Sequence, residues 1–320
     1  MEKIVVVGSV ILDIAAYTPA FSEDGLTRIG EKLKISPGGK GFNQAAAAKL
    51  AGAEVSMVAK LGNDLFSDYL FRHYEKIGFN TRYMVKDPEQ ETGSAIIEIN
   101  TKTAENRIIL LKGANDALTA EDVRRAEKAF EECRLVLTQL ETGMEAVVET
   151  KRLAKKYGKA LVINTAPYRP IPDGLFNEVD YITPNETEAS YYSGIEVKDM
   201  KSARSAAKEL LKMGARNIII TLGGQGSYYT DGEVEYEIPA IRAGDAVDTT
   251  GAGDAYNAGL CVALSEGRNI KDALLFASCT AGLKVTRRGS SVAMPAREKI
   301  NNLFFRIKEE QHALCQGENG

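Results

Sequence analysis

The run Ile4-Val5-Val6-Val7, which ends at Gly8, decides the fold of this chain. Consecutive aliphatic residues, most of them β-branched, predict a strand that is buried on both faces, as the strands of a parallel sheet are. A signal-peptide core is the competing interpretation, but Gly8 and Ser9 interrupt the apolar run and Glu2 spoils the basic start that such a segment needs. We therefore expect residues 4–7 to form a central strand.

Outward from this strand, helix and strand patterns alternate along the chain. A helix is expected over 41–50 because this stretch is rich in alanine, and Gly52 is expected to end it. The other expected helices are 64–77, 121–133, 144–157, 186–193, 200–213, 253–265, 270–285 and 296–308. Further strands are expected at 55–59, 135–138, 160–164, 181–183 and 218–222, with two antiparallel strands within 226–238. This order predicts an α/β fold with a doubly wound, mostly parallel sheet flanked by helices.

Two stretches depart from the alternation. Strand patterns at 81–85, 94–99 and 107–111 predict a local all-β insertion, and residues 13–37 predict irregular chain with edge strands near 31–35. We expect a single domain over residues 1–320 that carries a small β-sheet lid, with insertions at about 13–37 and 92–112. The tail beyond Gln311 is expected to be frayed.

Composition restricts the class of ligand. The 320 residues carry 40 Lys and Arg against 44 Asp and Glu, a net charge of −4, so no overall positive field favours nucleic acid or an anionic membrane. No apolar stretch is long enough to cross a bilayer. The 4 cysteines lie far apart without a CxxC pair, which argues against a zinc site or a disulfide scaffold and favours a reducing cytoplasm. The expected ligand is a small molecule.

The strongest motif is Asp248-Thr249-Thr250-Gly251-Ala252-Gly253-Asp254, which leads into an apolar helix. Its glycines let the backbone turn tightly, and free N–H groups at the helix start attract an anion, so the stretch predicts a phosphate cradle. A carboxylate beside a bound phosphate would repel it, so Asp254 needs another task. A general base next to a transferring phosphoryl group is such a task. Simple stabilisation of the helix start is the alternative.

Other well-known catalytic motifs are absent from the sequence. Gly39-Lys40 is followed by Gly41 where a P-loop has Ser or Thr, no GxGxxG follows a strand, and the HRD and DFG signatures of protein kinases are missing. The only histidines, His73 and His312, lie in polar contexts, so a histidine triad or a histidine metal site is not expected.

A glycine cluster, Pro37-Gly38-Gly39-Lys40-Gly41-Phe42-Asn43-Gln44, opens the helix at 41–50. Each glycine at a helix entrance costs roughly 0.5–1 kcal/mol of backbone entropy, a cost that makes sense where a ligand meets the main chain closely. Lys40 and Asn43 could then hydrogen-bond hydroxyl groups. A plain loop before an alanine-rich helix is the alternative.

A third cluster, Thr183-Pro184-Asn185-Glu186-Thr187-Glu188, follows a predicted strand. Asn185 can cap the next helix, and Glu186 and Glu188 lie in the first turn of that helix, so capping alone explains much of the pattern. The sharper interpretation is a magnesium ion that these acids hold through water, near nucleotide phosphates.

These clusters, in their order and spacing, together with Thr221-Leu222-Gly223, resemble the ribokinase branch of the PfkB sugar kinases. The resemblance covers nearly the whole chain, and Gln139-Leu140-Glu141 also points toward ribokinases. It implies a ribokinase-like fold and a kinase that uses ATP and Mg²⁺. The implied reaction transfers the γ-phosphoryl group to the primary hydroxyl of a furanose sugar, ribose first, to give ribose 5-phosphate.

The resemblance also implies a role for individual residues. Asp254 would take the proton from the sugar hydroxyl, and the amides of Gly251, Ala252 and Gly253 would form the anion hole. The residues implied to hold the sugar are Asp13, Gly39, Lys40, Asn43, Glu141 and Asp254. Those implied to serve the nucleotide are Asn185, Thr221, Gly223, Gly226 and Ser278, with Glu188 holding magnesium through water. Those implied to surround a potassium-like cation are Asp248, Thr250, Lys284, Arg287 and Gly289.

A homodimer is the implied assembly. The two β insertions would pair between subunits through the lid, and apolar residues at 96, 97, 108 and 109 fit such a contact, although half of them must face the other side of the sheet. Dimerisation is therefore expected through the lid.

Two positions depart from the ribokinase pattern. Ile11 stands where ribokinases usually have Asn, and the lost side-chain hydrogen bond, typically worth about 0.5–1.5 kcal/mol, puts ribose in doubt. Ala293 stands where a Ser of the cation loop is often found, so the alternatives are a weaker cation site or one that Ser290 or Ser291 completes. The open alternatives are another acceptor, namely a different pentose, a deoxysugar, a ketohexose or a nucleoside, and a catalytically silent protein that binds sugar or nucleotide.

Overall fold

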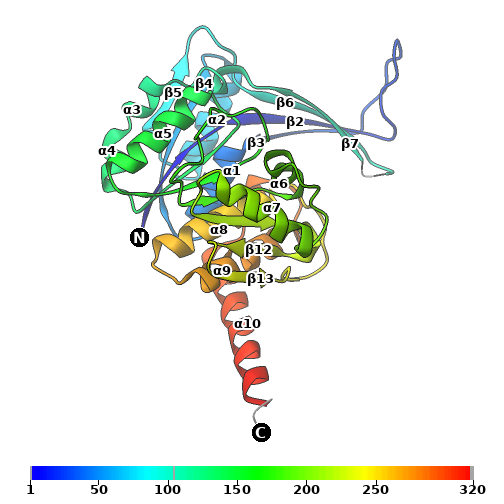
Figure 1. Cartoon of the computed structure of the whole chain (residues 1–320). Helices are drawn as coiled ribbons and strands as arrows, with labels where there is room; N and C mark the ends of the chain where they lie inside the picture. The colour runs from blue at the N-terminus through cyan, green and yellow to red at the C-terminus, as the bar shows by residue number, and fades with distance from the viewer. Residues whose placement is uncertain (1, 104, 318–320) are drawn as a thin grey trace.

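Strand β1 (Lys3–Val7) lies inside the main sheet, as its sequence predicts. The computed structural model describes residues 2–103 and 105–317, and Figure 1 shows how its elements are arranged. β1 pairs in parallel with β4 (Glu54–Gly62) on one side and with β8 (Leu135–Gln139) on the other. Its side chains alternate between two apolar layers, with Ile4 and Val6 in one and Val5 and Val7 in the other.

The main sheet has 9 strands in the order β13-β12-β11-β10-β9-β8-β1-β4-β5. Its other members are β5 (Tyr83–Asp87), β9 (Ala160–Asn164), β10 (Tyr181–Ile182), β11 (Asn217–Thr221), β12 (Ser227–Thr230) and β13 (Glu235–Ile238). All neighbours pair in parallel except β12 and β13, which run antiparallel at one edge. The α/β fold with a mostly parallel sheet is thus confirmed.

Helices cover both faces of this sheet. One layer contains α1 (Lys40–Leu50), α2 (Leu65–Lys76), α8 (Ala252–Ser265), α9 (Ile270–Lys284) and α10 (Arg297–Gly317). The other contains α3 (Ala120–Arg124), α4 (Glu127–Glu132), α5 (Met144–Lys156), α6 (Glu186–Ser193) and α7 (Met200–Lys212). Within the described residues, no helix is long and apolar enough to cross a membrane.

A second, smaller sheet of 4 strands, in the order β3-β2-β6-β7, extends away from the helical layers (Figure 1). Its strands are β2 (Ile11–Thr18), β3 (Lys32–Gly38), β6 (Ser94–Asn100) and β7 (Asn106–Leu111), and we call these four strands the lid sheet. β2 pairs antiparallel with β3 and parallel with β6, so the two inserted stretches of sequence meet in one sheet.

Two strand predictions need correction. The strand expected at 81–85 does not belong to the lid sheet: it is β5, which pairs in parallel with β4 at the edge of the main sheet and buries Met84 in the core. The stretch expected to be irregular after residue 13 contains most of β2, a regular strand. Local alternation predicts that a segment is extended but not which strand it pairs with, because pairing depends on distant segments.

Two helix predictions also need correction. The helix expected over 121–133 is two short helices, because the chain turns at Arg125 and Ala126, and Ala126 is fully buried there. The helix expected to end at 308 continues as α10 to Gly317, so the prediction of a frayed tail beyond Gln311 is wrong for the residues up to 317. Residues 318–320 lie outside the described residues.

Candidate active site

The candidate site lies where the parallel strands end. Ser9 follows β1, Glu141 follows β8, Asn164 ends β9, and Asn185 follows β10, so their side chains meet at the carboxyl edge of the sheet. Crevices at this edge are where open α/β sheets bind ligands. The first residues of α1 and α8 close over the same edge, because both helices begin there and Asn43 of α1 contacts Asp254 of α8.

The loop before α8 has the backbone of an anion cradle. Gly251 caps the helix with φ +79°, in the left-handed region that favours glycine. Within residues 2–103 and 105–317 the N–H groups of Gly251 and Gly253 have no hydrogen-bond partner, whereas the Ala252 N–H donates to the Thr249 carbonyl at 3.0 Å. The carboxylate of Asp248 fixes the loop, since it accepts N–H bonds from Thr250 at 2.9 Å and from Gly289 at 2.8 Å. Burial opposes ionisation of Asp248, but these hydrogen bonds outweigh it and lower its pKa.

Asp254 is buried beneath this loop and is 7% exposed. Its two carboxylate oxygens accept hydrogen bonds from two neighbouring amide side chains of α1: Asn43 Nδ2 donates to Oδ2 at 2.9 Å and Gln44 Nε2 donates to Oδ1 at 3.0 Å. The carboxylate therefore points toward the glycine cluster at the start of α1 and not into bulk solvent. A helix-stabilising role alone would not require such partners from a segment two hundred positions away in the chain.

Lys40 is the cation of the site. Burial would lower the pKa of its ammonium, but the carboxylates of Asp254, Glu141 and Glu188 outweigh burial and raise that pKa. Glu141 is itself buried, where Oε2 accepts the Lys40 backbone N–H at 3.0 Å and the Ser9 hydroxyl. One ammonium thus faces three carboxylates, so the site carries surplus negative charge.

Asp13 faces the same glycine cluster from β2. The backbone of Gly38 lies directly against its carboxylate, so that a Cβ at residue 38 would clash with it. Burial raises the pKa of Asp13 to about 6, the nearby carboxylate of Glu141 adds to the rise, and Lys34 opposes it. The expected sugar residues Asp13, Gly39, Lys40, Asn43, Glu141 and Asp254 therefore gather at one place.

Asn185 and Glu188 form a reciprocal capping box at the start of α6. Asn185 Oδ1 accepts the Glu188 N–H at 2.9 Å, and Glu188 accepts from Asn185 and from the Thr165 hydroxyl at 3.0 Å. Burial raises the pKa of Glu188, and the hydrogen bonds and the charge of Lys40 oppose that rise. A carboxylate has about four lone-pair sites, so Glu188 retains acceptor capacity for a metal-bound water.

The residues expected at the nucleotide are only partly brought together. Thr221 forms an isolated parallel bridge with Asn185. Gly223 lies near the Glu186 carboxylate, since a Cβ added at Gly223 would be 3.6 Å from its Oε1. Gly226 has φ +103° and packs tightly against the backbone of Ile238, which explains its glycine structurally. Ser278 is buried within α9, and no hydrogen bond among residues 2–103 and 105–317 links it to the others.

The residues expected around a monovalent cation do lie together. Besides its bonds to Thr250 and Gly289, Asp248 offers its backbone carbonyl to the Lys284 ammonium at 2.8 Å. Arg287 donates its backbone N–H to the carbonyl of Lys284 at 3.1 Å. The Ser291 hydroxyl donates to the carbonyl of Pro37 at 2.8 Å and so ties this loop to lid strand β3.

A chain of buried amides behind Asp254 is missing from the predicted site. Gln139 Nε2 donates to Gln44 Oε1 at 2.7 Å, and Gln44 Nε2 also donates to Asn164 Oδ1 at 3.0 Å. Asn164 in turn donates to the carbonyl of Thr183 at 3.0 Å. Gln44 and Gln139 stand in quoted motifs, but only the fold shows that they support the same carboxylate. The usable signal was an amide directly before the run of four alanines in this helix.

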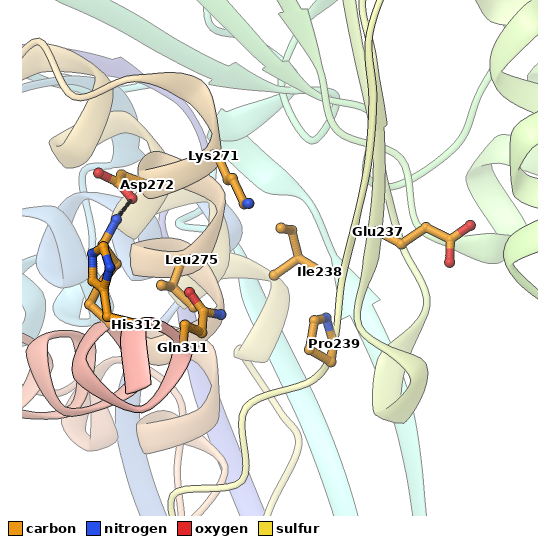
Figure 2. Close-up of a pocket in the computed structure, with 9 residues that line it drawn as sticks. Glu237, Ile238, Pro239, Lys271, Asp272, Leu275, Gln311 and His312 are labelled. Atoms are coloured by element: carbon orange, nitrogen blue, oxygen red, sulfur yellow. Dashed lines mark hydrogen bonds and ion pairs between the residues drawn. The ribbon is translucent and has the colours of Figure 1, made fainter. Parts of the chain in front are cut away.

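A pocket of about 370 Å³ lies elsewhere, between β13, α9 and α10 (Figure 2). It is lined by Glu237, Ile238, Pro239, Lys271, Asp272, Leu275, Lys308, Gln311 and His312. None of these residues belongs to the candidate site. Within the described part of the chain, no group of three or more His, Cys, Asp or Glu side chains is arranged to hold a metal ion directly.

The fold and the site together define a phosphoryl-transferring α/β protein, and comparison with known proteins gives its family. The model for pfkB family carbohydrate kinases matches residues 1–297. A deoxyribokinase of Salmonella typhi is 35% identical over 93% of this chain and 97% of its own length. A ribokinase of Bacillus subtilis is 35% identical over 95% of this chain and 100% of its own length.

Solved structures agree with these relatives. A ribokinase of Arabidopsis thaliana, complexed with ribose and ATP, matches 95% of this chain and 99% of its own with a TM-score of 0.87 and 28% identity. The chain belongs to the pfkB family of carbohydrate kinases. It is a ribokinase-like phosphotransferase, so the alternative of a catalytically silent binding protein loses its support.

Proposed function

We propose that this kinase transfers the γ-phosphoryl group of ATP to the exocyclic primary hydroxyl of a pentofuranose, with ribose and 2-deoxyribose as the two leading acceptors. The observation that carries the proposal is the placement of Asp254, a buried carboxylate at the start of α8 that two amides of α1 orient toward the Lys40 loop. A base held beside an anion cradle is what phosphoryl transfer to an alcohol requires.

In this mechanism Asp254 accepts the proton of the attacking hydroxyl. The transition state of phosphoryl transfer is loose and asks little of its nucleophile, so an aspartate can take the proton late. The amides of Gly251 and Gly253 are the donors for the transferring group, because they have no hydrogen-bond partner within the described residues. The Ala252 amide joins them if it exchanges the Thr249 carbonyl for the phosphoryl group. Lys40 adds positive charge in a buried setting, where charge is poorly screened.

The sugar subsite consists of the side chains that gather near Asp254. Asp13 and Glu141 are acceptors for sugar hydroxyls, Asn43 can donate or accept, and Gly39 brings the main chain close. Asn43 Oδ1 is buried without a hydrogen-bond partner among the described residues, which suits a ligand hydroxyl as its donor. Asp254 completes this subsite as the residue beside the reacting hydroxyl.

The nucleotide subsite is proposed along the neighbouring strand ends, with Asn185, Thr221, Gly223, Gly226 and Ser278 as its residues. Bound Mg²⁺ would neutralise charge on the nucleotide phosphates. Glu188 would hold that ion through water, which its remaining acceptor capacity and the surplus of carboxylates around Lys40 allow. The lid sheet would exclude water from the transfer, because water competes with the sugar as acceptor.

A specific observation favours 2-deoxyribose as the second candidate. Ile11 lies two residues before Asp13 on β2, so both side chains face the same side of that strand, and Ile11 is buried. An aliphatic side chain beside Asp13 offers nothing to a hydroxyl, and a hydroxyl buried without a partner costs about 1–3 kcal/mol. A sugar carbon without a hydroxyl group, such as the one that distinguishes 2-deoxyribose from ribose, therefore fits better beside Ile11.

An acceptor screen tests the proposal. Purified protein with ATP and Mg²⁺ is offered ribose, 2-deoxyribose, other pentoses, ketohexoses and nucleosides, and ADP release is measured. We expect the highest kcat/KM for one of the two pentoses, and Ile11→Asn should raise the ribose to deoxyribose ratio by about 2–10-fold, the value of one hydrogen bond. Turnover with nucleosides or ketohexoses only would contradict the proposal.

We also propose that two copies pair through the lid sheet. β7 is an edge strand whose residues are exposed throughout, and Ile108 and Ile109 are 57% and 63% exposed. An unpaired, apolar edge strand is a template for pairing with another chain. The occupant we assign is a second copy of this chain, because Leu33 and Ile96 lie on the same face of the lid sheet as Ile109 and extend its exposed apolar surface.

A further inference from the structure

Lys284, the last residue of α9, is fully buried, with 0% of its surface exposed. Lysine is almost never buried completely unless its ammonium is paired, because desolvating a charge is costly. The mechanism above gives Lys284 no task. A buried ammonium at the edge of the candidate site therefore needs its own explanation.

The partner of the ammonium is a backbone carbonyl of the phosphate loop. Lys284 Nζ donates to the carbonyl oxygen of Asp248 at 2.8 Å, and no carboxylate in the described part of the chain forms an ion pair with it. Burial lowers the pKa of Lys284, while the charges of Asp248 and Asp254 oppose this and favour the ammonium. The positive charge thus lies under the loop that carries Gly251 and Asp254.

This is the position where the family resemblance implies a potassium-like cation, and the residues present do not fit one. Potassium needs several oxygen ligands to replace its hydration shell, and carbonyl oxygens usually supply them. Here the carbonyl oxygen of Asp248 already accepts the Lys284 ammonium, and each carboxylate oxygen of Asp248 already accepts one backbone N–H bond, so each of these oxygens has only one lone-pair site left for an ion. Ser291 donates its hydroxyl to Pro37, and Ala293 has no hydroxyl. A second cation beside a buried ammonium would also be repelled.

We propose that the Lys284 ammonium permanently replaces the monovalent cation, so that this kinase holds its phosphate loop in the active conformation without potassium. The ammonium is tethered to α9, so the site is filled at every salt concentration and needs no ion from solution. It bonds the same loop that begins α8, and it supplies positive charge near Asp254. The inference rests on the proposed function only for its effect on turnover; its effect on stability is independent of the substrate.

The first test is thermal unfolding of the protein in KCl, NaCl or choline chloride at equal ionic strength, with and without ATP. A ligand that binds only the folded state raises the melting temperature. We expect the unaltered protein to melt at the same temperature in all three salts. Lys284→Ala should melt lower in choline chloride and recover by a few degrees in KCl alone, because the vacated space and carbonyl then accept the ion.

The second test measures ADP release in the same salts with the best acceptor of the screen. We expect turnover of the unaltered protein to agree within about twofold between KCl and choline chloride, and Lys284→Ala to lose about 10–100-fold in choline chloride, as an electrostatic stabiliser does, and to regain part of it in KCl. Lys271→Ala, which removes an exposed lysine from the same helix, is the matched control and should not respond to potassium.

Potassium-specific activation or stabilisation of the unaltered protein would overturn the proposal. An indifferent Lys284→Ala variant would also overturn it, because the ammonium would then have no role that a cation can take over. If Lys284→Ala does not fold, Lys284→Met, which keeps the length and removes the charge, replaces it, and the melting of the unaltered protein still decides. If no acceptor is found, the melting experiments remain valid, so the two proposals can fail separately.

Discussion

The candidate site and the lid sheet are built in opposite ways. Around Asp254, the carboxylate of α8 and buried amides from α1 and two strand ends hold one another at 2.7–3.0 Å. In the lid sheet, β7 is exposed along its whole length and β3 is exposed at 3 of its 7 residues, although both are regular strands. A buried polar network fixes groups accurately because each unpaired member would be costly. The exposed side chains of the lid sheet are not held in this way, and their surface is available to a partner.

The two regions meet at the start of the lid sheet. β2 leaves the body directly after Ser9 and Val10, and Asn115 holds Val10 by a hydrogen bond in each direction at 2.8 Å. Asp13 lies two residues into this strand, so a sugar residue of the site is carried on the lid sheet. The residues proposed for the transfer step are therefore held by the main α/β body, whereas the lid sheet contributes one of the residues proposed to bind the sugar. Substitutions should therefore act very differently in the two regions.

The largest effect is expected at the centre of the buried network. Asp254→Asn removes the proton acceptor, and turnover should fall by about 10²–10⁴-fold while sugar affinity stays nearly intact. Steady-state ADP release gives kcat, and calorimetry gives the dissociation constant of the sugar. Asp245→Asn changes an exposed aspartate of the same loop and is the control. Full turnover of Asp254→Asn would end the assignment of the base.

A smaller loss is expected from the amide that supports this carboxylate. Gln44→Leu leaves Asp254 with one amide partner and leaves Gln139 without its acceptor, so kcat should fall by about 10–100-fold as the base loses its orientation. The KM for sugar should hardly change, because Gln44 has no assigned sugar contact. Gln90→Leu, at an exposed position, is the control. A change in KM with an unchanged kcat would contradict the positioning role.

Asp13 should make sugar binding depend on pH. With a pKa of about 6, its ionised fraction falls from about nine-tenths at pH 7 to about one-tenth at pH 5, so the KM for sugar should rise by about tenfold. The KM of Asp13→Asn should be higher and flat over this range. A KM of the unaltered enzyme that is constant from pH 7 to pH 5 would show that Asp13 does not bind the sugar as a carboxylate.

The same group predicts the sign of a stability change. The pKa of Asp13 is raised from 3.8 to about 6 on folding, so its stabilising contribution is complete below pH 4 and is lost as the pH rises through 6. Asp13→Asn should therefore raise the melting temperature at pH 7–8, and this gain should disappear near pH 4. Differential scanning calorimetry at several pH values checks it. If Asp13→Asn were less stable than the unaltered protein at pH 8, burial of the ionised Asp13 carboxylate would not be destabilising.

The smallest effect on catalysis is expected in the lid sheet. Ile109→Lys places a charge on the exposed edge strand and should convert dimers to monomers, because charged edge strands resist pairing. Light scattering measures the mass in solution, and kcat should fall by less than about threefold, since no polar group around Asp254 is touched. Val234→Lys, at an exposed valine of the main sheet edge, is the control. An unchanged mass would contradict pairing through β7.

Sequence reasoning succeeded where local pattern carries the information. The valine-rich strand, the parallel alternation after residue 121 and the helices that begin within the clusters at 37–44 and 248–254 all depend on neighbouring residues, and the structure contains each of these elements. The sequence analysis misassigned β5 and β2, because the sequence of an extended segment does not show which strand it pairs with. It also missed the shared support of Asp254 by Gln44 and Gln139, which lie 95 positions apart.

The sequence by itself determined the fold class, because hydrophobic periodicity and glycine-rich turns are local properties of the chain. The family followed from the resemblance of its motifs to those of known kinases. Tertiary structure alone decided which side chains share one space. Lys284 belongs to an apolar helix in the sequence, and only folding brings its ammonium to the carbonyl of Asp248, 36 residues away. Long-range contacts of this kind depend on how layers pack, and packing is a property of the whole molecule.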